Sequence, residues 1–326
     1  MKSKLVLLAG GFLLILGCNK TSSPKNENTV PEEETFTATQ RQCASYDVLL
    51  EQMNADPTLK TRMEVIEAFT SRIAADPQSA RLLPSGIVEI PVVFNVLYKT
   101  AAQNVSQAQL QSQIDVLNED YAGTNADHNA TSTYNSVKAG DIRVRFVLDQ
   151  VKRKSTTKSS WTTNDAMKKN AQGIAPTSPA TKLNIWVCNL SGGILGYAQF
   201  PGGNSNTDGV VLDDNATGRT GTAAAPFNKG RTATHEVGHW LNLRHIWGDA
   251  TCGNDLVGDT PLHNAANFGC PAAGHRSTCT GTPIEMTMNY MDYTDDACMY
   301  MFSNGQKTRM LAVFSSGGPR NSFAQP

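Results

Sequence analysis

The sequence predicts an α+β domain that follows a short helical segment, and three observations lead to this fold class. Apolar residues first recur at helical steps, runs of β-branched residues then alternate with helical patterns, and the last third is irregular and rich in cysteine, glycine and asparagine. The 326 residues, 40% of them hydrophobic and 17% charged, are enough to bury a sizeable core. A formal net charge of −1 gives no reason to expect nucleic acid as a partner.

Residues 1–17 have the pattern of a secretory signal peptide. Two lysines precede an apolar run, residues 5–16, that is too short to span a bilayer comfortably. The run ends in Leu16-Gly17-Cys18, which resembles the lipobox of bacterial lipoproteins, where the cysteine carries the lipid. The alternative is an ordinary signal peptide that happens to contain Cys18. In either case we expect an exported protein, held in the bacterial cell envelope only through a lipid anchor or extracellular after processing.

Residues 18–80 are predicted to form a tether and then a helical prosegment. Residues 19–35 are polar, with two prolines and an acidic run. From about residue 44 to 75 the apolar spacing becomes helical, and Asp56-Pro57 separates two helices because proline disfavours a helical residue before it. Nothing in this segment has a catalytic pattern. The main domain is therefore expected to span residues 81–326.

The main domain is predicted to begin with a long strand and an amphipathic helix. Residues 87–98 are β-branched and aromatic, and Pro91 among them indicates a sheet edge or a bend. Residues 106–121 have the apolar spacing of a helix. Further strands are predicted at residues 143–149, 183–188, 196–200 and 209–212. Much later, Ser303 and Gln306 form a capping-box pattern that predicts the start of a final helix.

The run HEVGHWLNLRH, residues 235–245, has the spacing of a zinc site. His235 and His239 are one helical turn apart, so both imidazoles can reach one Zn²⁺ at about 2.0–2.1 Å. Glu236 lies at the edge of that face, where a carboxylate can take a proton from an attacking water. His245 can join them only if the helix stops near Asn242 and the chain turns back. Three histidines leave one open position, which is typical of catalytic zinc.

Chance spacing of surface or core histidines is the alternative, since a bare pair of this kind has a real false-positive risk. Three of the six histidines in the chain nevertheless fall within this one run. A structural zinc is disfavoured because such sites prefer cysteine ligands and fill all four positions.

The run resembles the long zinc motif of the metzincin clan of metallopeptidases, and its details are similar to the pappalysin family, especially its compact bacterial members. The similarity continues through residues 246–249, through residues 289–293 and through the closing residues 302–310. It extends over most of residues 81–326. The resemblance implies a metzincin catalytic domain with a twisted mixed sheet, an active-site helix and an irregular disulfide-linked subdomain that ends in a helix. It also implies a zinc metalloendopeptidase acting on proteins and peptides.

The chain departs from the metzincin pattern at Asn242, where the family usually has glycine because the turn favours a positive φ. Asparagine is the side chain best suited to that conformation, so His245 is still expected to bind zinc. The resemblance further implies that Met291 forms a floor beneath the histidines. It implies that Tyr293 donates a hydrogen bond to the oxyanion; a packed tyrosine with a solvated hydroxyl is the alternative.

Similar enzymes bind substrate as an added strand, and residues 196–200, with Tyr197 and Ala198, are the candidate edge. Compact bacterial pappalysins cut on the N-terminal side of arginine or lysine, which requires an acid in the specificity pocket. Asp295 and Asp296 are the candidates, and Asp296 is preferred; solvated loop acids are the alternative. The junction Ala80-Arg81 would itself be cut by such an enzyme.

Relatives in the family also bind calcium after the zinc motif. Hard oxygen ligands are offered here by Asn254, Asp255, Val257, Asp259 and Thr260, although the segment matches no EF-hand and loops of this composition usually bind nothing. The cysteines of the irregular region, Cys252, Cys270, Cys279 and Cys298, are expected to form two bridges, with three pairings possible. Each bridge should stabilise the fold by roughly 2–4 kcal/mol.

Cys43, ahead of the predicted helices, suggests a latent zymogen. In similar zymogens a prosegment cysteine ligates zinc and so inhibits the enzyme, and zinc has high affinity for thiolate. The alternative is a Cys43–Cys188 disulfide. We therefore expect a monomeric, self-processing zymogen inhibited by its own prosegment. A catalytically silent binding lipoprotein and a zinc amidase acting on non-protein substrates are the competing classes.

Overall fold

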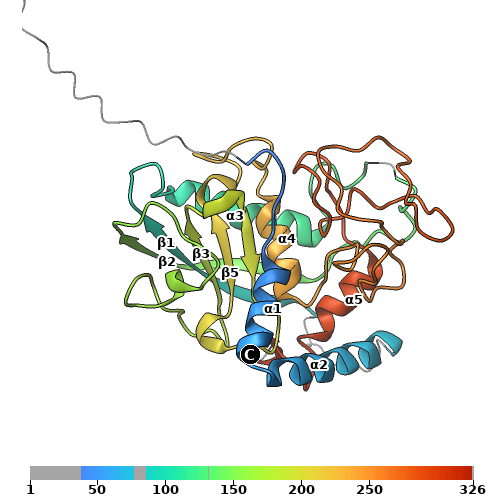
Figure 1. The fold of residues 1–326 in the computed structure, drawn as a ribbon, viewed down its shortest axis with the longest axis horizontal. Coiled ribbons are helices and arrows are strands. Elements are labelled where there is room, and N and C mark those ends of the chain that lie inside the picture. Colours follow the sequence, from blue (N-terminus) through green and yellow to red (C-terminus); the bar gives the residue numbers. More distant parts are fainter. Residues whose placement is uncertain (1–37, 77–85, 131, 325–326) are drawn as a thin grey trace, which may run out of the picture. The chain divides into compact units, whose positions relative to one another are not determined.

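The computed structural model describes residues 38–76, 86–130 and 132–324 (Figure 1). The predicted signal peptide, Cys18, the tether and the Ala80-Arg81 junction lie outside these residues. Within the described ranges, no helix combines the length and the apolar character needed to cross a membrane.

A five-stranded sheet in the order β2-β1-β3-β5-β4 forms the centre of the fold (Figure 1). The strands are β1 Val88–Tyr98, β2 Val144–Ser155, β3 Leu183–Cys188, β4 Gly196–Ala198 and β5 Val210–Asp213. The first four in the sheet order pair in parallel, and β4 is antiparallel to β5. Every residue of β3 is buried, as a parallel strand covered on both faces requires. The predicted mixed sheet is confirmed, and β4 forms one of its edges.

The expectation that Pro91 marks an edge strand is wrong, because β1 lies between β2 and β3. The proline is tolerated for a local reason. Strand β3 pairs with β1 only from Val92 onwards, so Pro91 has a hydrogen-bonded neighbour on one side alone. A register shift between Val92 and Val93 provides the alternative feature, an irregularity next to the proline. Strand β2 is also longer than predicted and extends to Ser155.

Two helices pack together beside the sheet and carry the central motif. They are α3 Gln107–Ala122 and α4 Arg231–Trp240. Ser106 caps α3 by accepting from the amide of Gln109, and Gly123 ends it at a φ of 64°. The apolar side chains of both helices join one buried core with the strands. This packing fixes α4 against the edge at β4 and β5.

The N-terminal segment contains the two helices expected, α1 Ser45–Ala55 and α2 Thr58–Ala75. Helix α1 lies beside β4, and α2 packs on the final helix, α5 Asn304–Ala312. Helix α5 begins with the predicted capping box, because Ser303 and Gln306 each bond the other's backbone amide.

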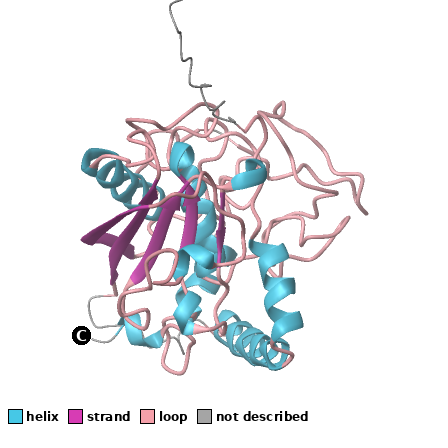
Figure 2. Ribbon diagram, turned by 60° about the vertical axis from the view of Figure 1, so that its left-hand side comes forward, coloured by secondary structure: helices cyan, strands magenta, loops and turns pink. Residues whose placement is uncertain are grey.

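Between α4 and α5 the described chain has neither a helix nor a strand (Figures 1 and 2). Two disulfides cross-link this region, and they settle which of the three pairings forms: Cys252–Cys279 and Cys270–Cys298. The pairing follows from chain folding, which the spacing of the cysteines did not reveal.

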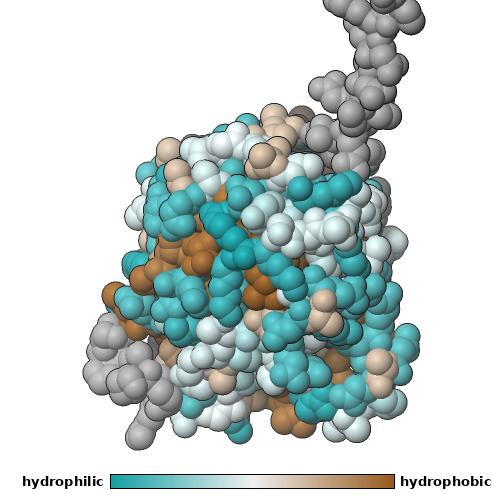
Figure 3. Space-filling model, turned by 90° about the vertical axis from the view of Figure 1, so that its left-hand side faces the viewer, coloured by the Kyte–Doolittle hydropathy of each residue, from teal (hydrophilic) through white to brown (hydrophobic). Residues whose placement is uncertain are grey.

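On the face shown in Figure 3, apolar areas are interrupted by hydrophilic residues, as is ordinary for a protein surface.

Candidate active site

Helix α4 is fully buried and ends where the sequence requires a turn. The amide of Leu243 donates back to the carbonyl of Gly238 at 2.9 Å, and Asn242 has a φ of 72°. The left-handed conformation expected at Asn242 is therefore present. This turn reverses the chain and returns His245 to the face that carries the other two histidines.

The three histidines of the motif converge on one point. The Nε2 atom of His239 lies 3.1 Å from that of His235 and 3.1 Å from that of His245. The Nδ1 atoms of His235 and His239 face the carbonyl oxygens of Tyr290 and Leu243, at 2.7 and 2.8 Å. Because a carbonyl only accepts, these Nδ1 atoms must carry the protons. Each of their Nε2 atoms then carries a lone pair, and these two lone pairs face each other without a proton between them.

This arrangement fits a zinc ion. Lone pairs 3.1 Å apart are unfavourable in a buried site unless a cation lies between them, and all three atoms could lie about 2.0–2.1 Å from one ion. Burial and the neighbouring imidazoles lower the pKa of His235 and of His239 well below the usual value, so both imidazoles are neutral, as zinc ligation requires. Among the described residues, one group of three or more His, Cys, Asp or Glu side chains could hold a metal ion, and it consists of Cys43 and these three histidines. Their ligand atoms all lie within 4.8 Å of one another.

A second layer of side chains holds the third histidine. His245 Nδ1 contacts the carboxylate of Asp249, and the ring of Trp247 stacks on its ring with centroids 4.4 Å apart. Such partners fix the orientation of a metal ligand. Met291 lies directly against α4, since a Cβ at Gly238 would come within 2.5 Å of its sulfur. The structure thus places the predicted methionine beside the helix that carries the first two histidines.

Glu236 is completely buried beside the histidines. Its Oε2 accepts from the hydroxyl of Ser45 at 2.8 Å and from the thiol of Cys43 at 3.3 Å. Its Oε1 has no hydrogen-bond partner among the described residues. Burial raises the pKa of Glu236 to about 7. A carboxylate with this pKa is well matched to general-base work near neutral pH.

Cys43 and Cys188 are both free thiols, so the alternative Cys43–Cys188 disulfide is absent from this structure. The backbone of Cys43 engages the hydroxyl of Tyr293, which accepts from its amide at 3.3 Å and donates to its carbonyl at 3.0 Å. Tyr293 also packs against His245, with ring centroids 5.0 Å apart. The hydroxyl is therefore bonded and close to the histidines, not solvated as the alternative required.

The N-terminal segment lies along β4, the predicted substrate edge. The amide of Leu195 donates to Gln42 O at 2.9 Å, and the amide of Ala44 donates to Gly196 O at 3.1 Å. The amide of Ala198 donates to the hydroxyl of Ser45 at 2.8 Å. The backbone groups of the edge that a substrate would pair with are thus occupied. The hydroxyl of Tyr197 donates a hydrogen bond to the carboxylate of Asp165.

Asp296 lies in a buried pocket that holds a basic side chain of the N-terminal segment. Arg41 Nη2 is 2.6 Å from Asp296 Oδ1, and both side chains are at most 1% exposed. Arg41 Nε donates to the carbonyl of Thr294 and Nη1 to the hydroxyl of Thr232, each at 3.2 Å. The guanidinium also lies over the ring of Phe227. The alternative of a solvated loop acid is therefore wrong for Asp296. We call this site the specificity pocket, after the role that is proposed for it below.

The predicted calcium residues are only partly brought together. The hydroxyl of Thr260 lies about equally close to both oxygens of Asp255 and to the carbonyl of Val257, at 2.9–3.0 Å. One hydroxyl proton cannot serve three acceptors. The carboxylate of Asp259 instead accepts from Ser303 and from an amide of α5. Asn254 caps a local turn through its side-chain oxygen.

The sequence interpretation overlooked Arg41, Ser45 and Asp249. A signal existed for Arg41, because an arginine two residues before the predicted inhibitory cysteine is the side chain that a pocket specific for basic residues would accept. Asp249 belongs to the stretch 246–249 that is similar to the pappalysin family, and it lies four residues after His245. Nothing in the sequence distinguished Ser45 from other serines.

Comparison with known proteins places these observations in context. A family model described as pregnancy-associated plasma protein-A matches residues 179–315, which include all three histidines. An extracellular metalloprotease of Arthroderma otae is 33% identical over 262 residues, covering 78% of this chain and 86% of the relative. An extracellular metalloprotease of Verticillium alfalfae is 33% identical over 253 residues, covering 74% and 83%.

Solved structures are similar in both sequence and fold. A promirolysin mutant of Tannerella forsythia has a TM-score of 0.78 at 40% identity, covering 87% of this chain and 97% of its own. Mature mirolysin of the same organism, in complex with a cleaved peptide, has a TM-score of 0.71 at 44% identity, covering 74% and 96%.

Proposed function

The chain belongs to the pappalysin family of zinc metallopeptidases, the family of pregnancy-associated plasma protein-A, and we propose that it is an endopeptidase made as a latent zymogen. One observation carries this proposal. Three imidazole nitrogens converge beside the buried carboxylate of Glu236, and a cysteine of the N-terminal segment lies against them. Peptide substrates are supported by the similarity to mature mirolysin, whose structure is a complex with a cleaved peptide. The direct test is to incubate the activated chain with a mixture of peptides and to sequence the products.

The three histidines are the proposed zinc ligands, with Met291 beneath them. When zinc is bound there, it supplies a Lewis acid for the scissile carbonyl and lowers the pKa of water. Glu236 takes a proton from the attacking water and passes it to the leaving amine. Once Cys43 has withdrawn, the hydroxyl of Tyr293 is free to donate a hydrogen bond to the oxyanion. The substrate pairs with the edge of β4, where Tyr197 and Ala198 present backbone groups.

Latency is supported by what the N-terminal segment occupies. Cys43 lies at the histidines, Ser45 bonds the proposed base, and Arg41 fills the specificity pocket. Burial raises the pKa of the Cys43 thiol, and a bound divalent cation opposes this because it deprotonates a coordinating thiol. The match to promirolysin extends over more of this chain than the match to mature mirolysin, as expected if a prosegment precedes the catalytic domain.

The prosegment has a second anchor far from the histidines. Glu67 of α2 forms a bidentate ion pair with Arg309 of α5, with both distances 2.8 Å. The side chain of Asn242 donates to the hydroxyl of Thr70 at 3.3 Å. These contacts connect α2 to α5 and to the turn that follows α4. We propose residues 18–80 as tether and prosegment and residues 81–326 as the catalytic domain, with cleavage at or near Arg81.

Arg41 occupies the pocket that is proposed for the substrate residue after the scissile bond, which supports cleavage on the N-terminal side of arginine or lysine. A guanidinium uses three acceptors in this pocket, whereas a lysine ammonium can reach only the carboxylate of Asp296 by the same geometry. Arginine should therefore be preferred over lysine, and Thr232 should contribute to that preference.

Replacing Thr232 by valine is expected to lower kcat/KM about tenfold for a peptide with arginine after the scissile bond, because a buried donor left unpaired costs about 1–3 kcal/mol. The matched lysine peptide should change less than about twofold, since its ammonium does not use that hydroxyl. The measurement is the arginine-to-lysine ratio of kcat/KM. Thr308→Val, on the exposed face of α5, is the control. An equal loss with both peptides would contradict this role.

A structural calcium ion is proposed at Asp255, Val257 and Thr260. Asp255 is buried, and burial raises the pKa of its carboxyl group to about 6, which indicates a carboxylate without a sufficient countercharge. The oxygens around the hydroxyl of Thr260 are hard ligands of the kind that calcium takes.

Adding calcium to calcium-free protein at constant zinc is expected to raise the Tm, because a ligand at 100 times its Kd stabilises the native state by about 2.7 kcal/mol. Asp255→Asn should abolish this rise. Asp259→Asn is the matched control: it should lower the Tm by weakening the hydrogen bonds that Asp259 accepts at the start of α5, while the calcium response remains. A calcium response that survives Asp255→Asn would rule out the site.

Export is supported by the relatives, which are named extracellular metalloproteases. The proposed signal peptide and lipid attachment at Cys18 rest on the sequence pattern alone, as does the monomeric state. The silent binding protein is disfavoured because Glu236 is present and buried beside the histidines. The zinc amidase remains the competing class, and a substrate panel that includes non-protein amides distinguishes it.

A further inference from the structure

Arg231 binds Asp296 at both its side chain and its backbone. The Oδ1 of Asp296 faces the specificity pocket and bonds Arg41. Its Oδ2 accepts from the amides of Lys229 and Arg231, at 2.7 and 3.3 Å. Its own carbonyl oxygen accepts from Arg231 Nη1 at 2.7 Å. The carboxylate therefore has one oxygen fixed by the backbone and one oxygen left for a bound basic side chain.

Arg231 is the first residue of α4, one turn before His235. Its hydrogen bonds to Asp296 connect the specificity pocket to the same helix that carries two of the proposed zinc ligands. The distance between the scissile bond and the acid that recognises the next side chain is thus set by one rigid element. A placement error of about 1 Å at such a point lowers the rate substantially.

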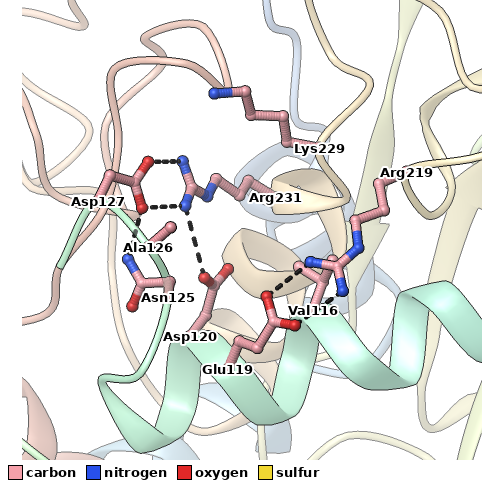
Figure 4. Close-up of a pocket in the computed structure, with 9 residues that line it drawn as sticks. All are labelled: Val116, Glu119, Asp120, Asn125, Ala126, Asp127, Arg219, Lys229 and Arg231. Atoms are coloured by element: carbon pink, nitrogen blue, oxygen red, sulfur yellow. Dashed lines mark hydrogen bonds and ion pairs between the residues drawn. The ribbon is translucent and has the colours of Figure 1, made fainter.

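The guanidinium of Arg231 is itself fixed by Asp127. Nη1 and Nη2 each donate to one oxygen of that carboxylate at 2.6 Å, and the Arg231 side chain is 6% exposed (Figure 4). Asp120 lies further away, at 3.8 Å, and its oxygens already accept from Thr234 and Tyr290. Asp127 is the main countercharge of this buried cation.

Asp120, Asp127 and Arg231 line a pocket of about 450 Å³ (Figure 4). Asp127 has a side chain that is 29% exposed, so it can be changed without opening a cavity in the core. A second pair in the same pocket, Glu119 with Arg219, has equivalent bidentate geometry, with distances of 2.6 and 2.7 Å. That pair makes no contact with Asp296 among the hydrogen bonds of the described residues, and it offers a matched control.

We propose that Arg231 and Asp127 are positioning residues for substrate specificity: Asp127 holds the Arg231 guanidinium on the carbonyl of Asp296, which keeps the carboxylate of Asp296 in place for a basic substrate. This inference rests on the proposed function of Asp296. Without the charge of Asp127, the nearest remaining carboxylate is that of Asp120, at 3.8 Å. A guanidinium that moves toward Asp120 leaves the carbonyl of Asp296, and the carboxylate that binds the basic substrate then loses its fixed position.

The test uses the zinc-loaded chain after activation and two peptides that differ only after the scissile bond, one with arginine and one with citrulline, its neutral isostere. Asp127→Asn is expected to lower the arginine-to-citrulline ratio of kcat/KM by about tenfold, which is within the loss of about 100-fold that a misplacement of about 1 Å can cause. The loss should be a higher KM for the arginine peptide, with kcat and the citrulline peptide unchanged. Asp127→Glu should restore part of the ratio, and Glu119→Gln should leave it as in the wild type.

Asp296→Asn separates this inference from the proposed function. If Asp296→Asn abolishes the arginine preference and Asp127→Asn does not change it, the positioning role is overturned while the specificity of Asp296 stands. If both variants keep the preference, the proposed function of Asp296 fails. An equal loss with both peptides in Asp127→Asn, together with a lower Tm, would reduce Asp127 to a structural residue and would also overturn the inference.

Discussion

Replacing Glu236 by alanine is expected to lower kcat by about 100- to 10 000-fold, the usual contribution of a positioned general base. The reason is local. Glu236 is the carboxylate of the central motif that lies next to the converging histidines, and burial raises its pKa to about 7. The measurement is steady-state hydrolysis of an arginine-containing peptide by the activated chain, with zinc content determined in parallel.

Zinc content and Tm are the controls for this variant, because Glu236 is not a proposed ligand. Both should stay close to the wild-type values. A variant that keeps its zinc and also keeps more than about a tenth of the wild-type kcat would exclude Glu236 as the base, because general acid–base catalysis supplies at least about 100-fold.

Replacing Cys43 by alanine is expected to make the unprocessed chain active. The variant removes the group that lies against the histidines, while Ser45 and Arg41 still hold the segment in place. An increase of about 5- to 150-fold over the wild-type zymogen is expected, the range typical of coupling between two binding events. The measurement is peptide hydrolysis before any cleavage, verified by intact mass.

Cys188→Ala is the matched control, because Cys188 is the other free thiol among the described residues and lies buried in β3. It should leave the zymogen latent. A thiol titration of the wild-type zymogen that found Cys43 neither free nor metal-bound would contradict the inhibitory role, as would a Cys43→Ala chain as inactive as the wild type.

Local signals in the sequence predicted the centre of the site. The spacing of His235 and His239 needs only helical geometry, and the position of His245 needs only a turn, for which Asn242 is suitable. The capping box at Ser303 likewise depends on residues close in sequence. These predictions succeed because the determining interactions span a few residues.

Long-range packing accounts for what the sequence did not reveal. Whether Pro91 lies on an edge strand depends on where β3 begins to pair, more than ninety residues later in the chain. The occupant of the specificity pocket, Arg41, and its partner Asp296 are 255 residues apart in the sequence. The carboxylate of Asp259 is used at the start of α5 because tertiary structure brings Ser303 to it.

Self-processing of the zymogen is the decisive measurement, made by intact mass and N-terminal sequencing of the wild-type chain and of Glu236→Ala. We expect that the wild type acquires a new N-terminus at or near Arg81 while the variant stays whole. That result would support the catalytic role of Glu236 and the basic specificity together. If both chains stay whole with zinc bound, and neither cuts any peptide after limited trypsin treatment, the peptidase mechanism proposed for this site is contradicted.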